Sequence, residues 1–378
     1  MKGLKTFASW MFLLALAIAV APFSAIASES AGSGLLLFGL AGVTVGNGNP
    51  TLSDLAKKMD PDNSIATIIE ILADTNQILE DMGWVEGNLP TGHKTTVRSG
   101  LPSVTWRLLN YGVQPSKSRT VQVTDTCGML EAYAEVDKAL ADLNGNTASF
   151  RMSEDMAFLE AMNQEMASKV FYGTEASPES FVGLAPRYDT YGTTDGVSSF
   201  NVLNGGGTGS DNTSMWLVVW GENTIHGIYP KGSMAGLQHN DLGEETLTDA
   251  NGGRYQGYRT HYKWDSGLTV RDWRYAVRIA NIDVSDLTTF GADTDNSANL
   301  IRLMIQAVNK IPNLGMGRGA IYVNRTVQTW LEIQANEKAN VQLGWRDFGE
   351  GQILTFRGIP IRRADALLET EAAVPAAS

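Results

Sequence analysis

Residues 84–119 read WVEGNLPTGHKTTVRSGLPSVTWRLLNYGVQPSKSR, a polar and basic segment punctuated by glycine and proline. Connections this long are uncommon inside compact domains, and they usually serve a function or reach outward. The segment carries five basic side chains and one acid, Glu86, whereas the whole chain has a formal net charge of −12. A positive arm on a negative body suggests a chain whose copies lie on one another.

Two parts of this segment, residues 94–98 and 117–124, have the alternating character that is typical of strands. Pro102 and Pro115, between them, disfavour a place in the centre of a sheet. We therefore predict that the segment is an extended, two-stranded hairpin.

The strongest helical pattern covers residues 147–172. Side chains of one face recur at steps of three and four residues, and Gly173 follows the last of them. The face consists of Met152, Met156, Leu159, Asn163, Met166 and Val170. This spacing predicts one long helix whose methionine-rich stripe packs against a sheet as part of the core.

The rest of the chain predicts a mixture of helices and strands. Helical spacing appears at residues 50–82, 128–143, 299–310 and 325–334. Strand-like sequence appears at residues 214–220, 224–229, 254–263, 272–282, 320–323 and 355–361, and residues 366–378 read as a loose tail. Because a long hairpin and a long helix precede these mixed elements, we predict an α+β protein and not a doubly wound sheet.

No pattern in the sequence predicts catalysis, a cofactor or a metal site, and we expect no enzyme. Residues 87–95, GNLPTGHKT, place the lysine one position too late for a phosphate-binding loop, and the four histidines form no ligand pair. The single cysteine, Cys127, excludes an intramolecular disulfide. Aromatic residues crowd residues 255–275, where a sugar-binding face is the alternative to packing between strands and subunits.

The first 45 residues differ from the rest of the chain. Lys2 and Lys5 precede an apolar run at residues 7–20, and small residues at 25–27 end it, which is the pattern of a secretory signal. A second apolar run, residues 35–45, is too short to span a bilayer. Two interpretations follow: a secreted protein, or a gene start placed too far upstream.

From residue 50 to residue 368 the chain resembles the major capsid (coat) proteins of short-tailed bacteriophages, which have the HK97-like fold. Long blocks carry the resemblance, among them LPTGHKTTVRSGLPSVTWRLLNYGVQPSKS at 89–118, FRMSEDMAFLEAMNQEMAS at 150–168 and LTFRGIPIRRADALL at 354–368. The resemblance implies an arm, an extended loop, a spine helix, and peripheral and axial domains. The implied division is a leader at 1–45, an N-terminal arm and first helix at 46–83, the extended loop at 84–125, the peripheral domain at 126–298 with the spine helix at 147–172, a mainly axial domain at 299–368, and a loose tail at 369–378.

In proteins of this family the extended loop lies across the adjacent subunit. The resemblance therefore implies that basic residues of the loop meet acidic surface on a neighbour. Some members of the family cross-link a loop lysine to an asparagine of a neighbour, but the sequence identifies no such pair, and we predict no covalent cross-link. The expected loop residues are Lys94, Arg98, Arg107, Lys117 and Arg119, and the expected acidic partners are Glu154, Asp155 and Glu160.

The resemblance also implies a function, which is self-assembly as hexamers and pentamers into an icosahedral phage head around double-stranded DNA. Its partners would be further copies of itself, a scaffold, a portal and a cement protein, with non-specific contact to the packaged DNA and no membrane. Such shells assemble in the host cytoplasm and end in the virion, so the signal-like residues 1–45 are expected to have no function in export. Two alternatives stay open: a bacterial encapsulin-like compartment, and a secreted sugar-binding or hydrolytic protein.

Overall fold

The computed structural model describes residues 76–145, 147–249, 251–288, 298–336, 343–348 and 351–377. All of them belong to one compact unit, residues 49–378. The predicted leader at 1–45 and most of the predicted arm and first helix at 46–83 lie outside the described residues. Among the residues described, no helix combines the length and the apolar character needed to cross a bilayer.

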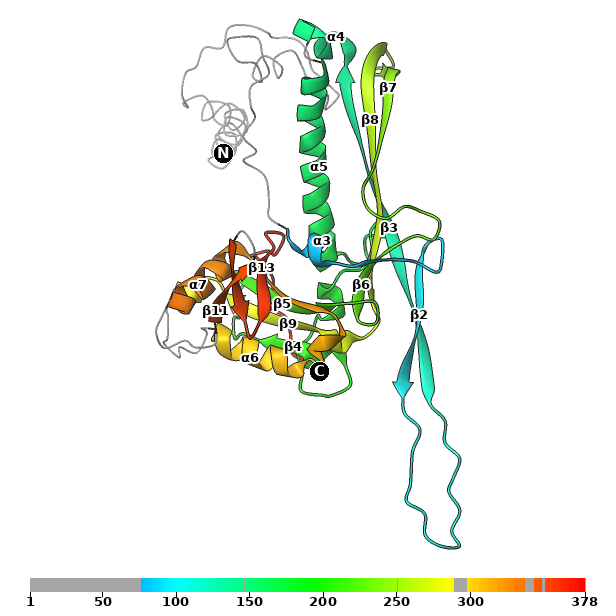
Figure 1. Ribbon diagram of the computed structural model, residues 1–378, viewed down its shortest axis with the longest axis vertical. Coiled ribbons are helices and arrows are strands. Elements are labelled where there is room, and N and C mark those ends of the chain that lie inside the picture. The colour runs from blue at the N-terminus through cyan, green and yellow to red at the C-terminus, as the bar shows by residue number, and fades with distance from the viewer. Residues whose placement is uncertain are drawn as a thin grey trace, which may run out of the picture. The chain divides into compact units, whose positions relative to one another are not determined.

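A continuous path of paired strands organises this unit (Figure 1). The path runs β11-β12-β13-β10-β5-β6-β8-β3-β2, with β1, β4, β7 and β9 paired beside it. The strands are β1 (Trp84–Glu86), β2 (Gly92–Gly100), β3 (Arg119–Asp137), β4 (Val202–Asn204), β5 (Asn212–Trp220), β6 (Ile225–Tyr229), β7 (Gln238–Thr248), β8 (Arg254–Val270), β9 (Ala276–Asp283), β10 (Arg318–Val323), β11 (Leu343–Phe348), β12 (Gly351–Phe356) and β13 (Ile359–Arg363). The described helices are α3 (Ile78–Asp81), α4 (Lys138–Ala141), α5 (Thr147–Tyr172), α6 (Leu300–Lys310) and α7 (Arg325–Asn336).

Strand β3 changes partner along its length. Residues 119–126 pair with β2 to form the predicted hairpin, and residues 127–137 pair with β8 in antiparallel register. The predicted helix at 128–143 is therefore wrong, apart from the short α4 at its end. Ala134 and Val136 are buried while Tyr133 is about half exposed, an alternation that cross-strand pairing with β8 selects over the local helical tendency.

Helix α5 has the predicted bounds, but only its second half lies in the main core, and the first half buries Phe150 in a small separate cluster with Val136 and Leu140. Met166 and Val170 are buried, whereas Met152 is 68% exposed and Met156 is 56% exposed. The prediction that the whole methionine stripe is core is therefore wrong for the first half of the helix. Figure 1 shows the reason: the first half runs beside the β7–β8 and β3 strands only, away from the strands β5 and β9 that build the main core.

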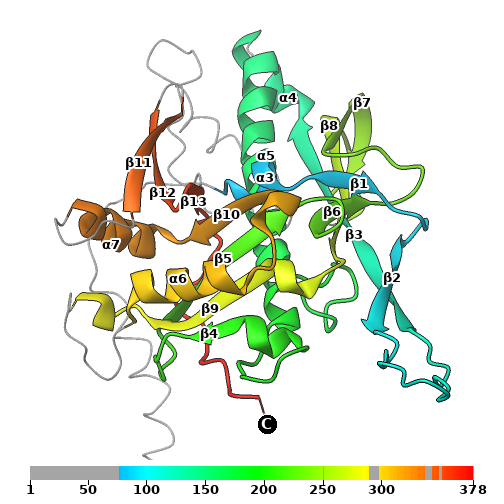
Figure 2. The ribbon, with the colours of Figure 1, turned by 60° about the horizontal axis from the view of Figure 1, so that its bottom comes forward.

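Strand β5 lies at the centre of the core and is buried along its whole length. Its odd-numbered side chains Met215, Leu217 and Val219 pack in one cluster with α6 and α7, and its even-numbered side chains pack in another with the end of α5. Figure 2 shows α6 lying along β9 on the first of these faces. Burial on both faces explains why the strand reads as an unbroken apolar run. The first cluster joins β5 and β9 with α6 and β10, across the predicted domain boundary at residue 298.

The C-terminal residues 366–377, which we call the C-terminal strap, are packed against the core, so the prediction of a loose tail at 369–378 is wrong for its described part. Val374 is 8% exposed and Glu371 is 7% exposed. The backbone of Glu371 donates to Asn212 on β5 at 2.9 Å, and the side chain of Asn281 on β9 bonds both backbone groups of Val374. These bonds satisfy the backbone of a segment that has no regular secondary structure.

Candidate functional site

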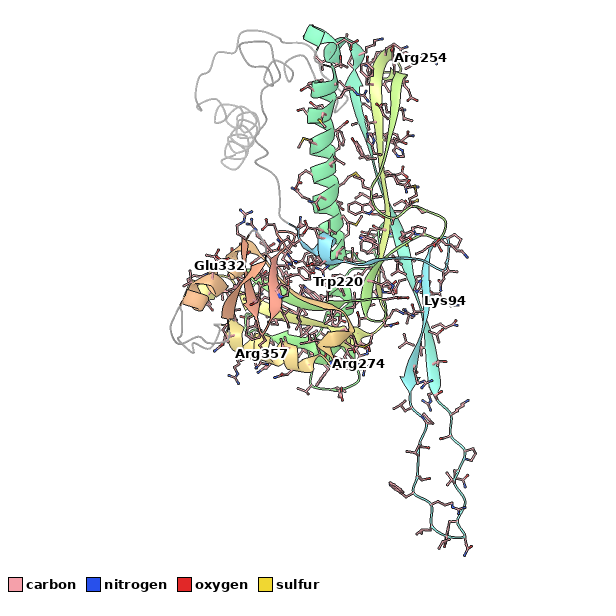
Figure 3. All side chains as sticks on the ribbon, in the orientation of Figure 1. Lys94, Trp220, Arg254, Arg274, Glu332 and Arg357 are labelled. Atoms are coloured by element: carbon pink, nitrogen blue, oxygen red, sulfur yellow. The ribbon has the colours of Figure 1, made fainter. Side chains whose placement is uncertain are left out.

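The hairpin of β2 and β3 ends in a connection, residues 101–118, which we call the hairpin tip. Every residue of the tip is exposed. Figure 3 shows its side chains standing clear of the other described elements. The tip carries exposed large apolar side chains, which are Leu101, Val104, Trp106, Leu108, Leu109, Tyr111 and Val113. A folded chain in water seldom exposes so much contiguous apolar surface unless something covers it.

All five predicted basic residues of the loop are exposed. Lys94 and Arg98 lie on β2, Arg107 and Lys117 lie in the hairpin tip, and Arg119 begins β3. No acidic residue occurs between Glu86 and Asp125, so the hairpin presents only positive charge. None of the five forms an ion pair with another residue in the described part of the chain.

The three predicted acidic partners lie within two turns of one another on α5, at residues 154–160, and are half-buried. Glu160 accepts a hydrogen bond from Gln164 at 2.9 Å. Burial raises the pKa of Asp155, while a hydrogen bond from the Tyr262 hydroxyl and the charge of Arg151 oppose that rise. None of the described ion pairs joins the basic set to the acidic set within one chain, so their pairing between chains stays a prediction.

At the root of the hairpin, β2 and β3 approach so closely that no side chain would fit at Gly92. Gly92 pairs with Thr126, and a Cβ atom on Gly92 would lie 2.0 Å from the carbonyl oxygen of Asp125. The carboxylate of Asp125 forms an ion pair at 2.8 Å with Arg187, which also donates to the carbonyl of Leu268. Close backbone approach and a buried carboxylate therefore fix the direction in which the hairpin leaves the sheet.

Two histidines also lie at the root. The ring centroids of His93 on β2 and His226 on β6 are 6.0 Å apart, and His226 is 1% exposed. Burial, aided by the charges of Arg271 and His93, lowers the pKa of His226 to about 4, although a hydrogen bond to the backbone of Gly221 and the charge of Glu222 oppose the shift. Burial also lowers the pKa of His93, against the charge of Asp125. Both rings are therefore neutral at pH 7.

We expect the buried His226 to make the stability of the protein depend on pH. In the unfolded chain this ring takes up a proton near pH 6.5, whereas the folded chain takes it up near pH 4. The unfolded state therefore binds more protons between these values, and the free energy of unfolding falls as pH drops through them, by at most about 3 kcal/mol. Urea denaturation of the wild type and of His226→Gln, each at pH 7.5 and pH 4.5, measures this loss in the free energy of unfolding. Equal losses in the two proteins would contradict the assignment.

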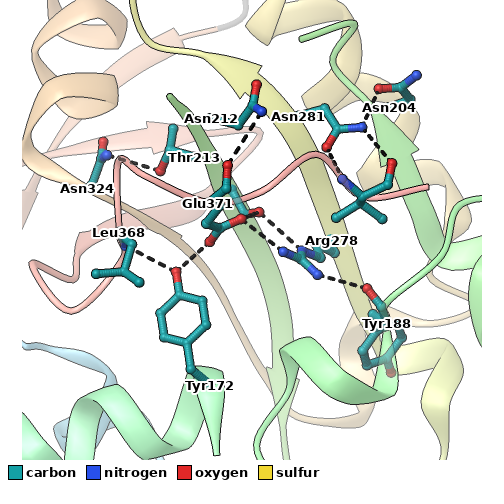
Figure 4. A network of polar contacts seen from close by, with 12 residues as sticks. Tyr172, Tyr188, Asn204, Asn212, Thr213, Arg278, Asn281, Asn324, Leu368 and Glu371 are labelled. Carbon is teal, nitrogen blue, oxygen red and sulfur yellow. Dashed lines mark hydrogen bonds and ion pairs between the residues drawn. The ribbon is translucent and has the colours of Figure 1, made fainter. Parts of the chain in front are cut away.

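One buried group was missed by the sequence analysis: the polar network that holds the C-terminal strap (Figure 4). The side chains of Arg278 and Glu371, each 6% exposed, form an ion pair at 2.9 Å. The hydroxyls of Tyr172 and Ser214 also donate to the carboxylate of Glu371. Arg278 completes its bonding with the carbonyl of Tyr188 at 2.9 Å. The sequence contains one feature that could have predicted this network, which is Arg278, because an arginine inside an apolar strand requires an acidic partner.

Comparison with known proteins shows that the chain is similar to phage capsid proteins. The family model described as major capsid protein GP7 matches residues 60–375. A chain in the near-atomic-resolution structure of bacteriophage Epsilon15 is 40% identical, with a TM-score of 0.68, and the match covers 88% of this chain and 99% of that chain. No curated protein matches the sequence.

More distant solved structures are similar in fold only. The bacteriophage JBD30 capsid is 8% identical, and the match covers 80% of this chain and 95% of that chain at a TM-score of 0.43. The SrpI encapsulin of Synechococcus elongatus is 10% identical, and the match covers 61% of this chain and 95% of that chain at a TM-score of 0.41.

Proposed function

The chain belongs to the GP7 family of major capsid proteins, and we propose that the extended hairpin of each copy joins the shell together by lying across the adjacent copy. The protein is a structural component of the phage head, whose copies self-assemble into the capsid of the virion. The predicted HK97-like α+β fold and the predicted shell function are confirmed. The manner in which copies contact one another is the subject of the proposal.

The observation that carries the proposal is the exposure of the hairpin tip. Trp106 is fully exposed, at 103% of the reference area, and Leu101, Val104 and Leu109 are each at least 80% exposed. Burying a large apolar side chain stabilises an interface by roughly 1.5–3 kcal/mol. Because the protein acts as a self-assembling shell, a neighbouring copy is the surface that covers the tip.

Charge supports the same arrangement. The hairpin presents five basic side chains to the surroundings, which are Lys94, Arg98, Arg107, Lys117 and Arg119. Helix α5 presents Glu154, Asp155 and Glu160. Complementary charge orients two copies as they approach, and it contributes more to the rate and geometry of association than to its strength. We therefore assign these eight residues to contact between adjacent subunits.

The wider assembly follows from the same family membership. We propose hexamers and pentamers that close an icosahedral shell around double-stranded DNA, with a scaffold, a portal and a cement protein as partners. The net charge of −12 suits a container for DNA, since an acidic wall does not grip the polyanion. Assembly takes place in the host cytoplasm, and the signal-like residues 1–45 do not function in export.

We expect charge reversal on the hairpin to block assembly and a matching reversal on α5 to restore it. Lys94→Glu with Arg98→Glu places like charges across the interface, and a loss of about 1.4 kcal/mol at each contact weakens it roughly tenfold. Adding Glu154→Lys with Glu160→Lys returns opposite charges, and it spares Asp155, which bonds Tyr262. Shells are counted by negative-stain microscopy of the void-volume fraction.

The control for this experiment is Arg254→Glu, at an exposed residue that begins β8, which Figure 3 labels away from the hairpin. It changes the net charge in the same direction and should leave assembly intact. Failure of the α5 reversal to restore shells would remove Glu154 and Glu160 from the interface.

A further inference from the structure

We propose that the hairpin tip of one copy inserts its apolar side chains, with Trp106 at their centre, into a groove along the first half of α5 in a second copy. The proposal rests on the proposed function, because it requires that the hairpin lie on an adjacent subunit. It goes further by naming the surface that receives the tip and the kind of contact that holds it, which is apolar burial in addition to charge.

The groove has a volume of about 470 Å³ and lies between α5 and the β7–β8 hairpin. Its floor and rim are apolar, formed by Met152, Met156 and Leu159 of α5 and by Leu237, which precedes β7. Met152, Met156 and Leu237 are 68%, 56% and 41% exposed. A hollow of this size accommodates one large aromatic ring with its neighbours, within the usual range of binding pockets.

Polar groups close the two sides of the groove and hold its shape. Arg151 forms an ion pair with Asp241 of β7 at 2.6 Å and also donates to Thr260 of β8 at 3.2 Å. Asp155 accepts a hydrogen bond from the hydroxyl of Tyr262, whose side chain is almost fully buried beneath. The groove is therefore preformed, so docking of the tip does not first require the helix and the strands to separate.

The tip and the groove complement each other in two respects. Both expose large apolar side chains, and burial of both surfaces in one contact removes them from water together. The tip adds the positive charge of Arg107 and Lys117, and Glu154 lies on the same turns of α5 as the groove. Met129 of β3 is also an exposed apolar residue, but it lies on the face of β3 opposite the buried Ala134 and Val136.

The methionines of the groove, Met152 and Met156, would allow the same contact to form at every position of a closed shell. A shell that contains rings of five and six subunits requires the same contact at slightly different angles. Methionine is unbranched and flexible, so a surface built from Met152 and Met156 can repack around the same indole ring in each setting. A β-branched residue at these positions would fix one shape only.

Disulfide trapping tests the proposal in the assembled, full-length protein. We combine Met156→Cys in the groove with Trp106→Cys or, to keep the indole, with Thr105→Cys. Mild oxidation of assembled particles should then give a ladder of covalent multimers on a non-reducing gel, and each single variant should give none. Native Cys127 does not interfere, because burial beside Asp265 and Asp125 raises the pKa of its thiol to about 12.

The matched control uses Met129→Cys in place of Met156→Cys. Met129 is 69% exposed and lies on the face of β3 opposite the buried Ala134 and Val136. A ladder with Met156→Cys and not with Met129→Cys supports the proposal. A ladder with Met129→Cys alone, or shells that give no ladder, overturns the groove assignment while leaving the proposed function in place. If the unmodified protein forms no shells or rings under conditions where it is folded, the proposed function and this inference fall together.

Discussion

The Glu371→Ala substitution is expected to lower the free energy of unfolding by about 3–5 kcal/mol, which is the usual effect of removing one partner of a buried ion pair. Arg278 would remain 6% exposed with no opposing charge, and two hydroxyl groups would lose their acceptor. The same carboxylate links the end of α5, through Tyr172, to β5, through Ser214, and to β9, through Arg278. Loss of one side chain therefore loosens three elements at once.

Urea denaturation of dissociated subunits measures this effect, since assembled shells would add the stability of their interfaces. The matched control is Glu369→Ala, two residues earlier in the C-terminal strap. Glu369 is exposed and bonds only Asn324 and Thr326 among the described contacts, so we expect about 1 kcal/mol or less.

A double variant separates the ion pair from the packing around it. Arg278→Met combined with Glu371→Leu removes both charges and keeps most of the buried volume, so it should be more stable than Glu371→Ala alone. If the double variant is less stable than Glu371→Ala, charge is not what holds the C-terminal strap, and backbone bonds such as those to Val374 would carry that role.

The hairpin and the spine helix could be predicted from the sequence because each is encoded by local periodicity. Alternation at 94–98 and 117–124 appears as the antiparallel pairing of β2 with β3, and the 3–4 spacing of residues 147–172 appears as α5. Both patterns depend on side chains within a few residues of each other, which a single sequence displays directly.

The wrong predictions concern segments whose structure is decided by residues far away in the sequence. β3 continues to Asp137 because β8, more than a hundred residues later, pairs with it. Met152 and Met156 are exposed because the main core ends before it reaches the first half of α5, which no helical spacing can reveal. The C-terminal strap packs because Arg278 and Asn281 on β9 need its carboxylate and its backbone. Of these, only the arginine in an apolar strand was a warning within the sequence.

The Gly92→Ala substitution is expected to abolish closed shells while leaving the subunit folded. An added Cβ would lie 2.0 Å from the carbonyl oxygen of Asp125, a distance at which the two strands must separate. Nine residues of β2 extend the hairpin by roughly 30 Å, so a rotation of about 10° at its root displaces the far end by about 5 Å. Such a displacement is more than an interface of matched side chains tolerates.

Gly100→Ala is the matched control, because it lies at the other end of the same strand and its Cβ would meet nothing closer than 3.5 Å. It should assemble as well as the wild type. Both variants should keep the wild-type free energy of unfolding in urea to within about 2 kcal/mol, since neither glycine lies in a core cluster. If Gly92→Ala assembles as efficiently as Gly100→Ala, then the hairpin adjusts freely at its root. The contact between copies would in that case be set by the tip and the groove, and the tight packing at Gly92 would serve only the fold of the subunit.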